Sequence, residues 1–274
     1  MTHPPAPAHV MTVDVEDWYH PLEPDPARWG GCEDRVEGST RRLLEVFADA
    51  GTLATFFVLG DVARRHPALV REIAAAGHEV ASHGMLHRFV YRQTPAEFAD
   101  DVRRSRDLLA DLSGAPVVGY RAPYFSITRR SPWALGVLRE LGFTYDASVH
   151  PVLNHRYGIP GAPRLPHRTA EGLLEIPPST FRLPPRVNVP CGGGAYFRLL
   201  PYAVTERMLA RLERAGERIV FYLHPWEVDP GHPRVPLPAG LRVRHYHALD
   251  RAEDRLRRLV RRFSFGSVRG VLAP

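Results

Sequence analysis

Lysine is absent from this 274-residue sequence, so all 36 basic residues are arginines. They are spread through every segment, with one denser run near the C-terminus. A nucleic-acid-binding protein would be expected to gather its basic residues on one face. The net charge of +6 therefore does not predict a nucleic-acid partner.

Cysteine and long apolar runs are also scarce. Two cysteines, Cys32 and Cys191, are too few for a disulfide framework, and whether they pair is left open. No apolar run is long enough to cross a membrane. The first ten residues, MTHPPAPAHV, lack the basic and apolar regions of a signal peptide. We therefore expect a reduced, cytoplasmic protein.

Short apolar runs alternate with helical patterns along the chain. Strands are predicted at 9–15, 53–60, 78–83, 116–123, 143–148, 172–179 and 218–224. Helices are predicted at 39–51, 61–77, 94–114, 131–142, 201–216 and 247–263. Such alternation predicts an α/β fold with a mostly parallel sheet. About seven units favour a barrel, with an open sheet as the alternative, and no linker or repeat divides residues 1–274, which predicts a single domain.

Two helix starts are marked by capping signals. Thr94 is the predicted cap of the helix at 94–114, with Pro95 at its first position and Glu97 completing a capping box. Ser39 is the predicted cap of the helix at 39–51, which Gly51 ends.

Polar and ionisable side chains follow five of the predicted strands. They are Asp14, Glu16 and Asp17 at the first strand, His83 and His87 after 78–83, Arg121 in 116–123, Asp146 and Ser148 in 143–148, and His224 after 218–224. In a barrel of parallel strands, the active site gathers at the C-terminal strand ends. Because the strands were assigned from apolar periodicity, this coincidence predicts a catalytic site there.

His83 and His87 are candidate metal ligands. A catalytic zinc site takes three protein ligands and keeps one position for water. Gly84 stands where the HExxH metallopeptidase motif needs glutamate, so that motif is excluded. Two nearby histidines alone are more often structural. The carboxylates after the first strand supply a third ligand, which favours a divalent metal site.

Three stretches resemble a known family. SHGMLH (82–87), RAPY (121–124) and LHPWE (223–227) are similar, in this order, to motifs of the polysaccharide deacetylases of carbohydrate esterase family 4, the NodB-homology group. The resemblance runs from Val10 to about Pro230 and is greatest to the branch tied to exosortase/PEP-CTERM exopolysaccharide loci. It implies a deformed (β/α) barrel, usually of seven strands.

The first motif departs from the family pattern. Where the family has T-F-D-D-G, this chain has Val13-Asp14-Val15-Glu16-Asp17. Asp14 matches the catalytic base, and the carboxylate ligand is either Glu16 or Asp17. Asp14 and Glu16 share one face of a strand, which favours Glu16, whereas Asp17 has the shorter side chain typical of the ligand.

The resemblance implies hydrolytic N-deacetylation of N-acetylhexosamine residues in a polysaccharide or a lipid-linked precursor. A divalent metal, expected to be Zn²⁺, binds the acetamide oxygen and a water, and Asp14 takes the proton of that water. Arg121 orients Asp14, the backbone N–H of Tyr124 helps to stabilise the oxyanion, and His224 protonates the leaving amine. Arg198, Trp226 and Asp146 are candidate substrate-binding residues, although a packing role for Trp226 and a loop-holding role for Asp146 are alternatives.

Two other functions compete with the deacetylase. One is a metal-free amidohydrolase similar to allantoinase, and the other is a catalytically silent glycan-binding module. The helix at 247–263 has an apolar stripe that we expect to pack on the barrel and an arginine-rich face that fits contact with the inner membrane surface. Histidines outside the motifs, including His150 and His245, are predicted to lie on the surface.

Overall fold

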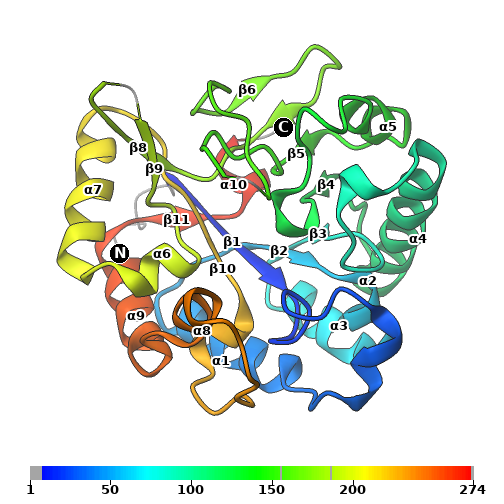
Figure 1. Ribbon diagram of the computed structural model, residues 1–274, viewed down its shortest axis with the longest axis horizontal. Coiled ribbons are helices and arrows are strands. Elements are labelled where there is room, and N and C mark those ends of the chain that lie inside the picture. The colour runs from blue at the N-terminus through cyan, green and yellow to red at the C-terminus, as the bar shows by residue number, and fades with distance from the viewer. Residues whose placement is uncertain (1–7, 155, 186, 273–274) are drawn as a thin grey trace, which may run out of the picture.

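A computed structural model describes residues 8–154, 156–185 and 187–272, and its centre is a curled sheet (Figure 1). The neighbouring strands follow the order β10–β1–β2–β3–β4–β5–β7–β6, and β11 also pairs with β1. The strands of this sheet are β1 (His9–Val15), β2 (Thr55–Val58), β3 (Glu79–Ser82), β4 (Gly119–Tyr120), β5 (Tyr145–Asp146), β6 (His167–Arg168), β7 (Leu174–Glu175), β10 (Val220–Leu223) and β11 (Phe265–Gly266).

Every neighbouring pair from β10 to β7 is parallel, whereas β6 runs antiparallel to β7. Between β7 and β10 the wall is irregular: the Ser179 N–H donates to the carbonyl of Val220, and the Tyr222 N–H donates to that of Gly192. The expected deformed barrel of about seven parallel strands is confirmed, with its gap filled by loop segments rather than by a regular strand.

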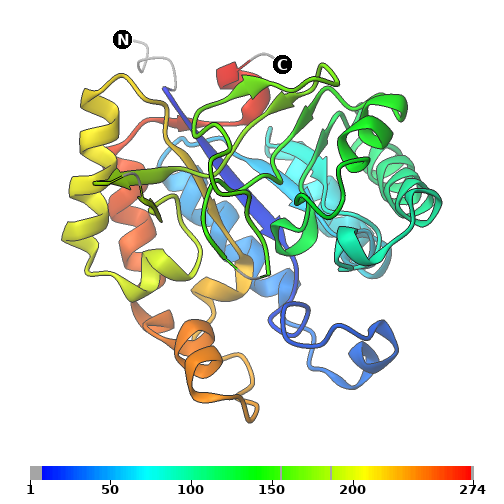
Figure 2. The same ribbon diagram turned by 45° about the horizontal axis from the view of Figure 1, so that its top comes forward.

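Helices surround the sheet, most of them on its outside, whereas α8 projects from one of its edges (Figure 1, Figure 2). They are α1 (Val36–Asp49), α2 (Gly60–Arg65), α3 (Pro67–Ala75), α4 (Pro95–Ser113), α5 (Ala134–Glu140), α6 (Ala195–Leu199), α7 (Tyr202–Arg214), α8 (Ala239–Tyr246), α9 (Ala252–Arg262) and α10 (Val268–Leu272). The predicted capping box of α4 is present, with Thr94 as the cap and Glu97 as its partner.

Alternation along β1 sends its side chains to opposite sides of the sheet. Met11, Val13 and Val15 belong to the large apolar core between the sheet and the outer helices. Val10 belongs to a smaller cluster with Phe57 and other residues on the inner side. Asp14 shares the inner side with Val10, which carries its carboxylate into the barrel rather than under a helix.

The strand register aligns the C-terminal ends of the central strands. Val15 pairs with Val58, and Val58 pairs with Ser82. Ser82 pairs with Tyr120, which in turn pairs with Asp146. The residues that follow these positions therefore leave the sheet at one level, and this is the edge at which the loop after β1 and helix α8 project (Figure 2).

The helix expected at 247–263 begins later than predicted, because Ala248 adopts a left-handed conformation (φ 52°) before a short 3-10 turn and α9. The residues of its predicted apolar stripe are all buried: Leu249, Ala252, Leu256, Leu259, Val260 and Phe263.

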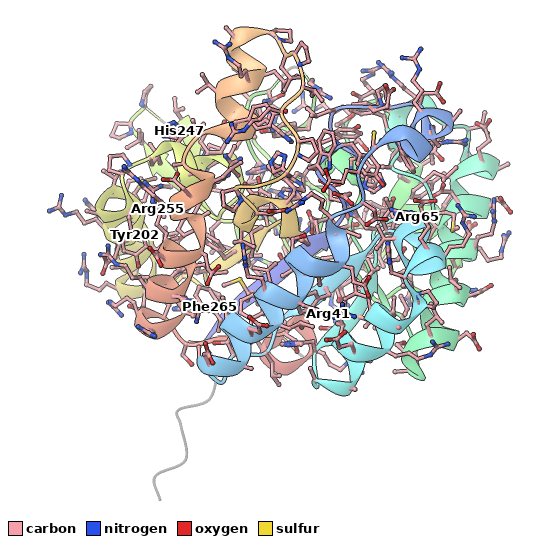
Figure 3. The ribbon with its side chains drawn as sticks, turned by 90° about the horizontal axis from the view of Figure 1, so that it is seen from below. Arg41, Arg65, Tyr202, His247, Arg255 and Phe265 are labelled. Carbon is pink, nitrogen blue, oxygen red and sulfur yellow. The ribbon has the colours of Figure 1, made fainter. Side chains whose placement is uncertain are left out.

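Most arginines of this C-terminal segment contact the protein itself. Arg255, labelled in Figure 3, donates to the carbonyls of Phe197, Arg198 and Leu200 at the C-terminal end of α6. Arg257 pairs with Asp49 and Glu253.

Several local predictions differ from the structure. Helix α1 begins at Val36, so Ser39 lies inside the helix and donates to the carbonyl of Arg35 instead of capping it. The antiparallel pair β8 (Thr180–Leu183) and β9 (Val187–Pro190), and helix α8, were not predicted. Cys32 and Cys191 are both free thiols. Among the described residues, no helix combines the length and apolar character needed to cross a membrane.

Candidate active site

A pocket with about 830 Å³ of space, open to solvent, lies at the C-terminal ends of the strands. Five carboxylate and imidazole side chains singled out from the sequence line it together: Asp14, Glu16, His83, His87 and His224. They come from β1 and from the residues after β3 and β10, which the strand register brings to one edge.

Glu16, His83 and His87 form the one group of three potential metal ligands found in the described residues. One ligand atom from each lies within 4.8 Å of the other two, and all three residues are buried. His87 Nε2 is in close contact with Glu16 Oε2, and His83 Nε2 lies 3.8 Å from the same oxygen. One carboxylate oxygen and two imidazole nitrogens facing one another fit a divalent cation with an open coordination position.

The surroundings orient two of these ligands. Nδ1 of His83 lies 2.8 Å from the backbone carbonyl of Arg121, which fixes the ring with Nε2 towards Glu16. The indole N–H of Trp226 donates to Oε1 of Glu16 (3.3 Å), whereas buried Oε2 has no hydrogen-bond donor within the described chain. Burial alone would raise the pKa of the Glu16 carboxyl, but His87 and His83 hold it well below its usual range.

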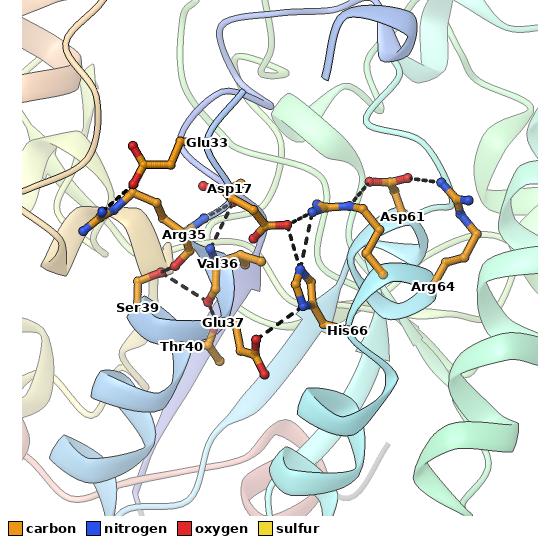
Figure 4. A network of polar contacts seen from close by, with 12 residues as sticks. Asp17, Glu33, Arg35, Val36, Glu37, Ser39, Thr40, Asp61, Arg64 and His66 are labelled. Carbon is orange, nitrogen blue, oxygen red and sulfur yellow. Dashed lines mark hydrogen bonds and ion pairs between the residues drawn. The ribbon is translucent and has the colours of Figure 1, made fainter. Parts of the chain in front are cut away.

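Asp17 points away from this group into a different polar network (Figure 4). Its Oδ2 accepts the backbone N–H groups of Arg35 (2.8 Å) and Val36 (3.0 Å), and its Oδ1 accepts that of Trp18 (2.8 Å). Asp17 therefore supplies the cap of α1 that the sequence had assigned to Ser39. It does not belong to the group of three ligands, and the geometry favours Glu16 as the carboxylate.

Asp14 and Arg121 form a buried ion pair. Nη1 of Arg121 donates to Oδ1 of Asp14 (2.7 Å) and to the hydroxyl of Thr12 (2.8 Å), and Nε donates to the carbonyl of Ala147 (3.1 Å). The guanidinium also lies over the ring of Phe57, 4.3 Å from its centroid. These contacts fix the Asp14 carboxylate with one oxygen held by Arg121 and the other towards the pocket.

His224 faces Asp14 and Glu16 across the pocket. Its Nε2 lies 3.9 Å from Oδ2 of Asp14 and 3.7 Å from Oε1 of Glu16, while Nδ1 lies 3.1 Å from Oε2 of Glu227. Burial favours the neutral ring, but the hydrogen bond to Glu227 and the surrounding carboxylates outweigh it and raise the pKa of His224 to about 9. The ring is thus held as a proton donor.

Glu227 and Arg198 were not connected to His224 by the sequence argument. Nε of Arg198 donates to Oε1 of Glu227 (2.8 Å), and burial, which alone would raise the pKa of Glu227, is outweighed by the charges of Arg198 and His224, so that it falls to about 2. The spacing of His224 and Glu227 by three residues, across a turn, was the signal that could have revealed the pair.

The three expected substrate-binding residues have different places. Trp226 lines the pocket and stacks on His224, with ring centroids 5.2 Å apart. Arg198 is only 1% exposed and does not line the pocket, because its guanidinium is used by Glu227 and by the carbonyls of 244, 245 and 247. Asp146 is fully buried and accepts from the hydroxyl of Ser148 (2.6 Å). The buried positions of Arg198 and Asp146 therefore do not fit a direct contact with substrate.

Tyr124 lines the pocket beside the three potential metal ligands. Its ring stacks on Phe89 with centroids 4.0 Å apart and meets His87 edge to face at 4.3 Å. Its backbone is left-handed (φ 58°), a conformation that is strained for a tyrosine and is often found at functional sites. The hydroxyl donates to the carbonyl of His20, which anchors the strained turn.

Two histidines predicted to lie on the surface are buried. His150 and His245 are 1% and 3% exposed. His245 stacks on Trp226 with ring centroids 4.4 Å apart and lines the pocket, so it belongs to the site. It comes from α8, a helix that the apolar pattern did not reveal.

Residues 30–145 match the family described as polysaccharide deacetylase. This part of the chain is therefore similar to the polysaccharide deacetylase family. Residues 147–273 match a second family, described as a domain of unknown function, DUF3473. The first match contains His83, His87 and Arg121, whereas His224 lies in the second, so the pocket described above draws on both parts.

A chitooligosaccharide deacetylase of a Bradyrhizobium species (strain ANU 289) is 34% identical over 128 residues, which are 46% of this chain and 56% of that protein. A peptidoglycan-N-acetylglucosamine deacetylase of Bacillus cereus is 25% identical over 148 residues, 50% of this chain and 53% of that protein. The chain thus spans about half the length of these curated relatives.

Two solved structures share the fold over nearly the whole chain. A crystal structure titled as a polysaccharide deacetylase from Mycobacterium smegmatis has a TM-score of 0.63 at 21% identity, covering 97% of this chain and 88% of that one. PuuE allantoinase has a TM-score of 0.61 at 16% identity, covering 97% and 90%. Both comparisons show that the fold of this chain is shared with these two proteins.

Proposed function

We propose that this protein is a metal-dependent hydrolase that removes acetyl groups from N-acetylhexosamine residues of a glycan. The observation that carries the proposal is the position of Asp14 and His224 on the two sides of one pocket, next to Glu16, His83 and His87. The relatives named as deacetylases of chitooligosaccharides and of peptidoglycan N-acetylglucosamine support this class of substrate.

His83, His87 and Glu16 would hold the cation, and Zn²⁺ suits two imidazoles and one carboxylate. When bound, it would supply Lewis-acid polarisation of the acetamide carbonyl and lower the pKa of a water molecule.

Asp14 is the proposed general base. Arg121 holds Oδ1, so the proton of the attacking water passes to Oδ2, the oxygen that faces the pocket. The same ion pair prevents the carboxylate from rotating away between turnovers. The backbone N–H of Tyr124 is proposed to donate to the oxyanion, which the strained turn at this residue would position.

His224 is the proposed general acid, and Glu227 and Arg198 position it. Glu227 accepts from Nδ1 and thereby turns Nε2 towards the space in front of Asp14. The proton on Nε2 of His224 passes to the amine nitrogen as the C–N bond breaks, which yields acetate and a free amino sugar.

The finer parts of the proposal rest on the sequence. We propose that residues 1–274 act as one domain, since β10 of the second matched part pairs with β1 at the centre of the sheet. A role in exopolysaccharide synthesis on a lipid-linked precursor would fit the branch that the motifs resemble. Contact of α9 with a membrane surface is the weakest part, because Arg255, Arg257 and Arg262 already have partners within the protein.

The test is acetate release from N-acetylglucosamine oligomers by chelated enzyme, with and without added Zn²⁺. We expect activity that returns with metal and is lost in His83→Ala and in Asp14→Asn. Activity that survives chelation would contradict the metal site and favour the metal-free amidohydrolase. Glycan binding without turnover in any metal would favour the silent binding module.

A further inference from the structure

The mouth of the pocket carries arginines that have no acidic partner. Arg156 and Arg244 line it, one from the loop after β5 and the other from α8. Neither forms an ion pair with any aspartate or glutamate, all of which lie within the described residues. Uncompensated positive charges at the rim of a pocket attract anionic ligands and raise their local concentration.

The acidic residues of the same pocket do not neutralise this rim. Asp14 is paired with Arg121, and Glu227 is shared by Arg198 and His224. Glu16 faces the two histidine ligands. The negative charge is thus held at the bottom of the pocket, and the entrance is cationic.

A second hollow of about 410 Å³ continues from this entrance, because Arg156 and Tyr157 line both. Its wall also contains Arg129 and Arg130, both exposed, and no aspartate or glutamate. We call the residues that line the second hollow, together with Arg244, the arginine groove. It gives the pocket an extension on one side only.

Aromatic rings hold these arginines in place. The Arg156 guanidinium carbon lies 5.3 Å from the ring centroid of Tyr124 and 5.5 Å from that of Phe89. The Arg130 guanidinium carbon lies 3.9 Å from the ring centroid of Tyr91, whose hydroxyl donates to the backbone carbonyl of Arg156. Such stacking limits the motion of a guanidinium and leaves its N–H groups free for a carboxylate or phosphate.

The groove begins close to the reacting centre. The Tyr124 ring contacts His87, and the Arg156 guanidinium lies over the same ring, so a single aromatic side chain links a proposed metal ligand to the first arginine. A sugar whose acetamide group reaches the metal site would therefore place its neighbour near Arg156. Arginine binds planar anions through two parallel hydrogen bonds, which suits a carboxylate or a phosphate on that neighbour.

We propose that the natural substrate is an anionic glycan, in which the sugar beside the N-acetylhexosamine carries a carboxylate or phosphate that the arginine groove binds. This inference rests on the proposed deacetylation and adds the chemical class of the flanking unit. A neutral chain would leave the unpartnered arginines facing water, whereas an acidic chain neutralises them along the direction in which the groove runs.

The experiment compares three probes on the metal-loaded protein. They are neutral N-acetylglucosamine oligomers, oligosaccharides alternating N-acetylglucosamine with glucuronic acid, and UDP-N-acetylglucosamine as a pyrophosphate-bearing probe. Acetate release is measured, and binding is measured separately by calorimetry on protein carrying Asp14→Asn. We expect at least one acidic probe to bind more tightly than the neutral one. The affinity for the acidic probe should fall as the salt concentration rises, because exposed charges are screened. Which acidic probe is preferred distinguishes a carboxylate from a phosphate.

Arg156→Gln and Arg130→Gln should each lower the binding affinity for the acidic probe about tenfold, which is the expected cost of losing one charge-assisted hydrogen bond. Binding of the neutral probe should weaken much less in both variants, and Arg156→Lys should recover part of the affinity lost for the acidic probe. Arg242→Gln is the matched control, since Arg242 is exposed on α8 and does not line the pocket.

Equal binding of acidic and neutral probes, or equal losses for both in Arg156→Gln, would overturn the inference even if acetate is released. If no probe is deacetylated while the acidic probe still binds through Arg156, the proposed function fails and the assignment of the groove stands.

Discussion

Arg121 donates to Asp14 across 2.7 Å in a place where both side chains are almost completely buried. Breaking a buried ion pair on one side leaves an uncompensated charge and costs about 3–5 kcal/mol, whereas removing both partners costs much less. We therefore expect Asp14→Asn and Arg121→Met each to lower the free energy of unfolding strongly in urea denaturation. The double variant should recover much of that stability.

Activity should not follow stability in this series. The double variant lacks the base, so its kcat should stay at least about a hundredfold below that of the wild type. A double variant that recovered activity together with stability would contradict the role of Asp14 as base.

The choice between Glu16 and Asp17 can be tested by metal binding alone. We expect Glu16→Gln and His83→Ala to lower Zn²⁺ affinity by more than about a hundredfold, the upper end of what loss of an outer contact costs. Asp17→Asn should keep the metal but destabilise the start of α1, because Oδ2 of Asp17 accepts two backbone N–H groups there. Calorimetric titration with Zn²⁺ and thermal melting separate the two effects. Loss of metal in Asp17→Asn with retention in Glu16→Gln would reverse the assignment.

Glu227→Gln tests the positioning of the acid. The amide cannot hold the imidazolium of His224 as the carboxylate does, so we expect kcat to fall about tenfold to a hundredfold with little change in KM. Exposed Glu171→Gln is the control. A rise in KM at unchanged kcat would indicate that Glu227 acts on substrate binding instead.

His78 should make stability depend on pH. Burial lowers the pKa of His78 to about 4, and its Nδ1 accepts the backbone N–H of Ala54. The unfolded chain therefore binds a proton below about pH 6.5 that the folded chain refuses, so stability falls as the pH drops from about 6.5 to 4, by about 1.4 kcal/mol per pH unit at most. Urea denaturation at several pH values in this range should show that the free energy of unfolding falls less steeply with decreasing pH in His78→Gln than in the wild type. An unchanged slope would mean that other groups carry the acid sensitivity.

Gly193 allows β10 to be approached closely by the loop that fills the barrel wall. A Cβ there would stand 1.8 Å from the carbonyl oxygen of Tyr222, and its φ of +115° is strained for other residues. We expect Gly193→Ala to cost at least about 1–3 kcal/mol from backbone strain, with the clash in addition. Gly136→Ala in α5 is the control, because nothing lies within 4 Å of its Cβ position and alanine favours helix by about 1 kcal/mol. Thermal melting distinguishes the two directions.

Local patterns revealed the strands that carry the site, since a buried strand such as His9–Val15 is short, rich in valine and followed by acidic residues. The same argument failed where a partner comes from far along the chain. The cap of α1 is Asp17, 19 residues before Val36, and Glu227 is neutralised by Arg198, 29 residues away. The prediction placed His245 on the surface because α8, which presents this residue to the pocket, has no regular apolar stripe that would have revealed the helix.

The position of β1 has a consequence for how the protein folds. This strand, which carries Asp14, pairs with Val220–Leu223 on one side, and its first residues also pair with Phe265 and Gly266. One edge of this strand therefore pairs with residues more than two hundred positions away, and such distant pairings form slowly. During synthesis, the histidine ligands can be complete long before the strand beside Asp14 exists, so catalytic competence should appear late and all at once.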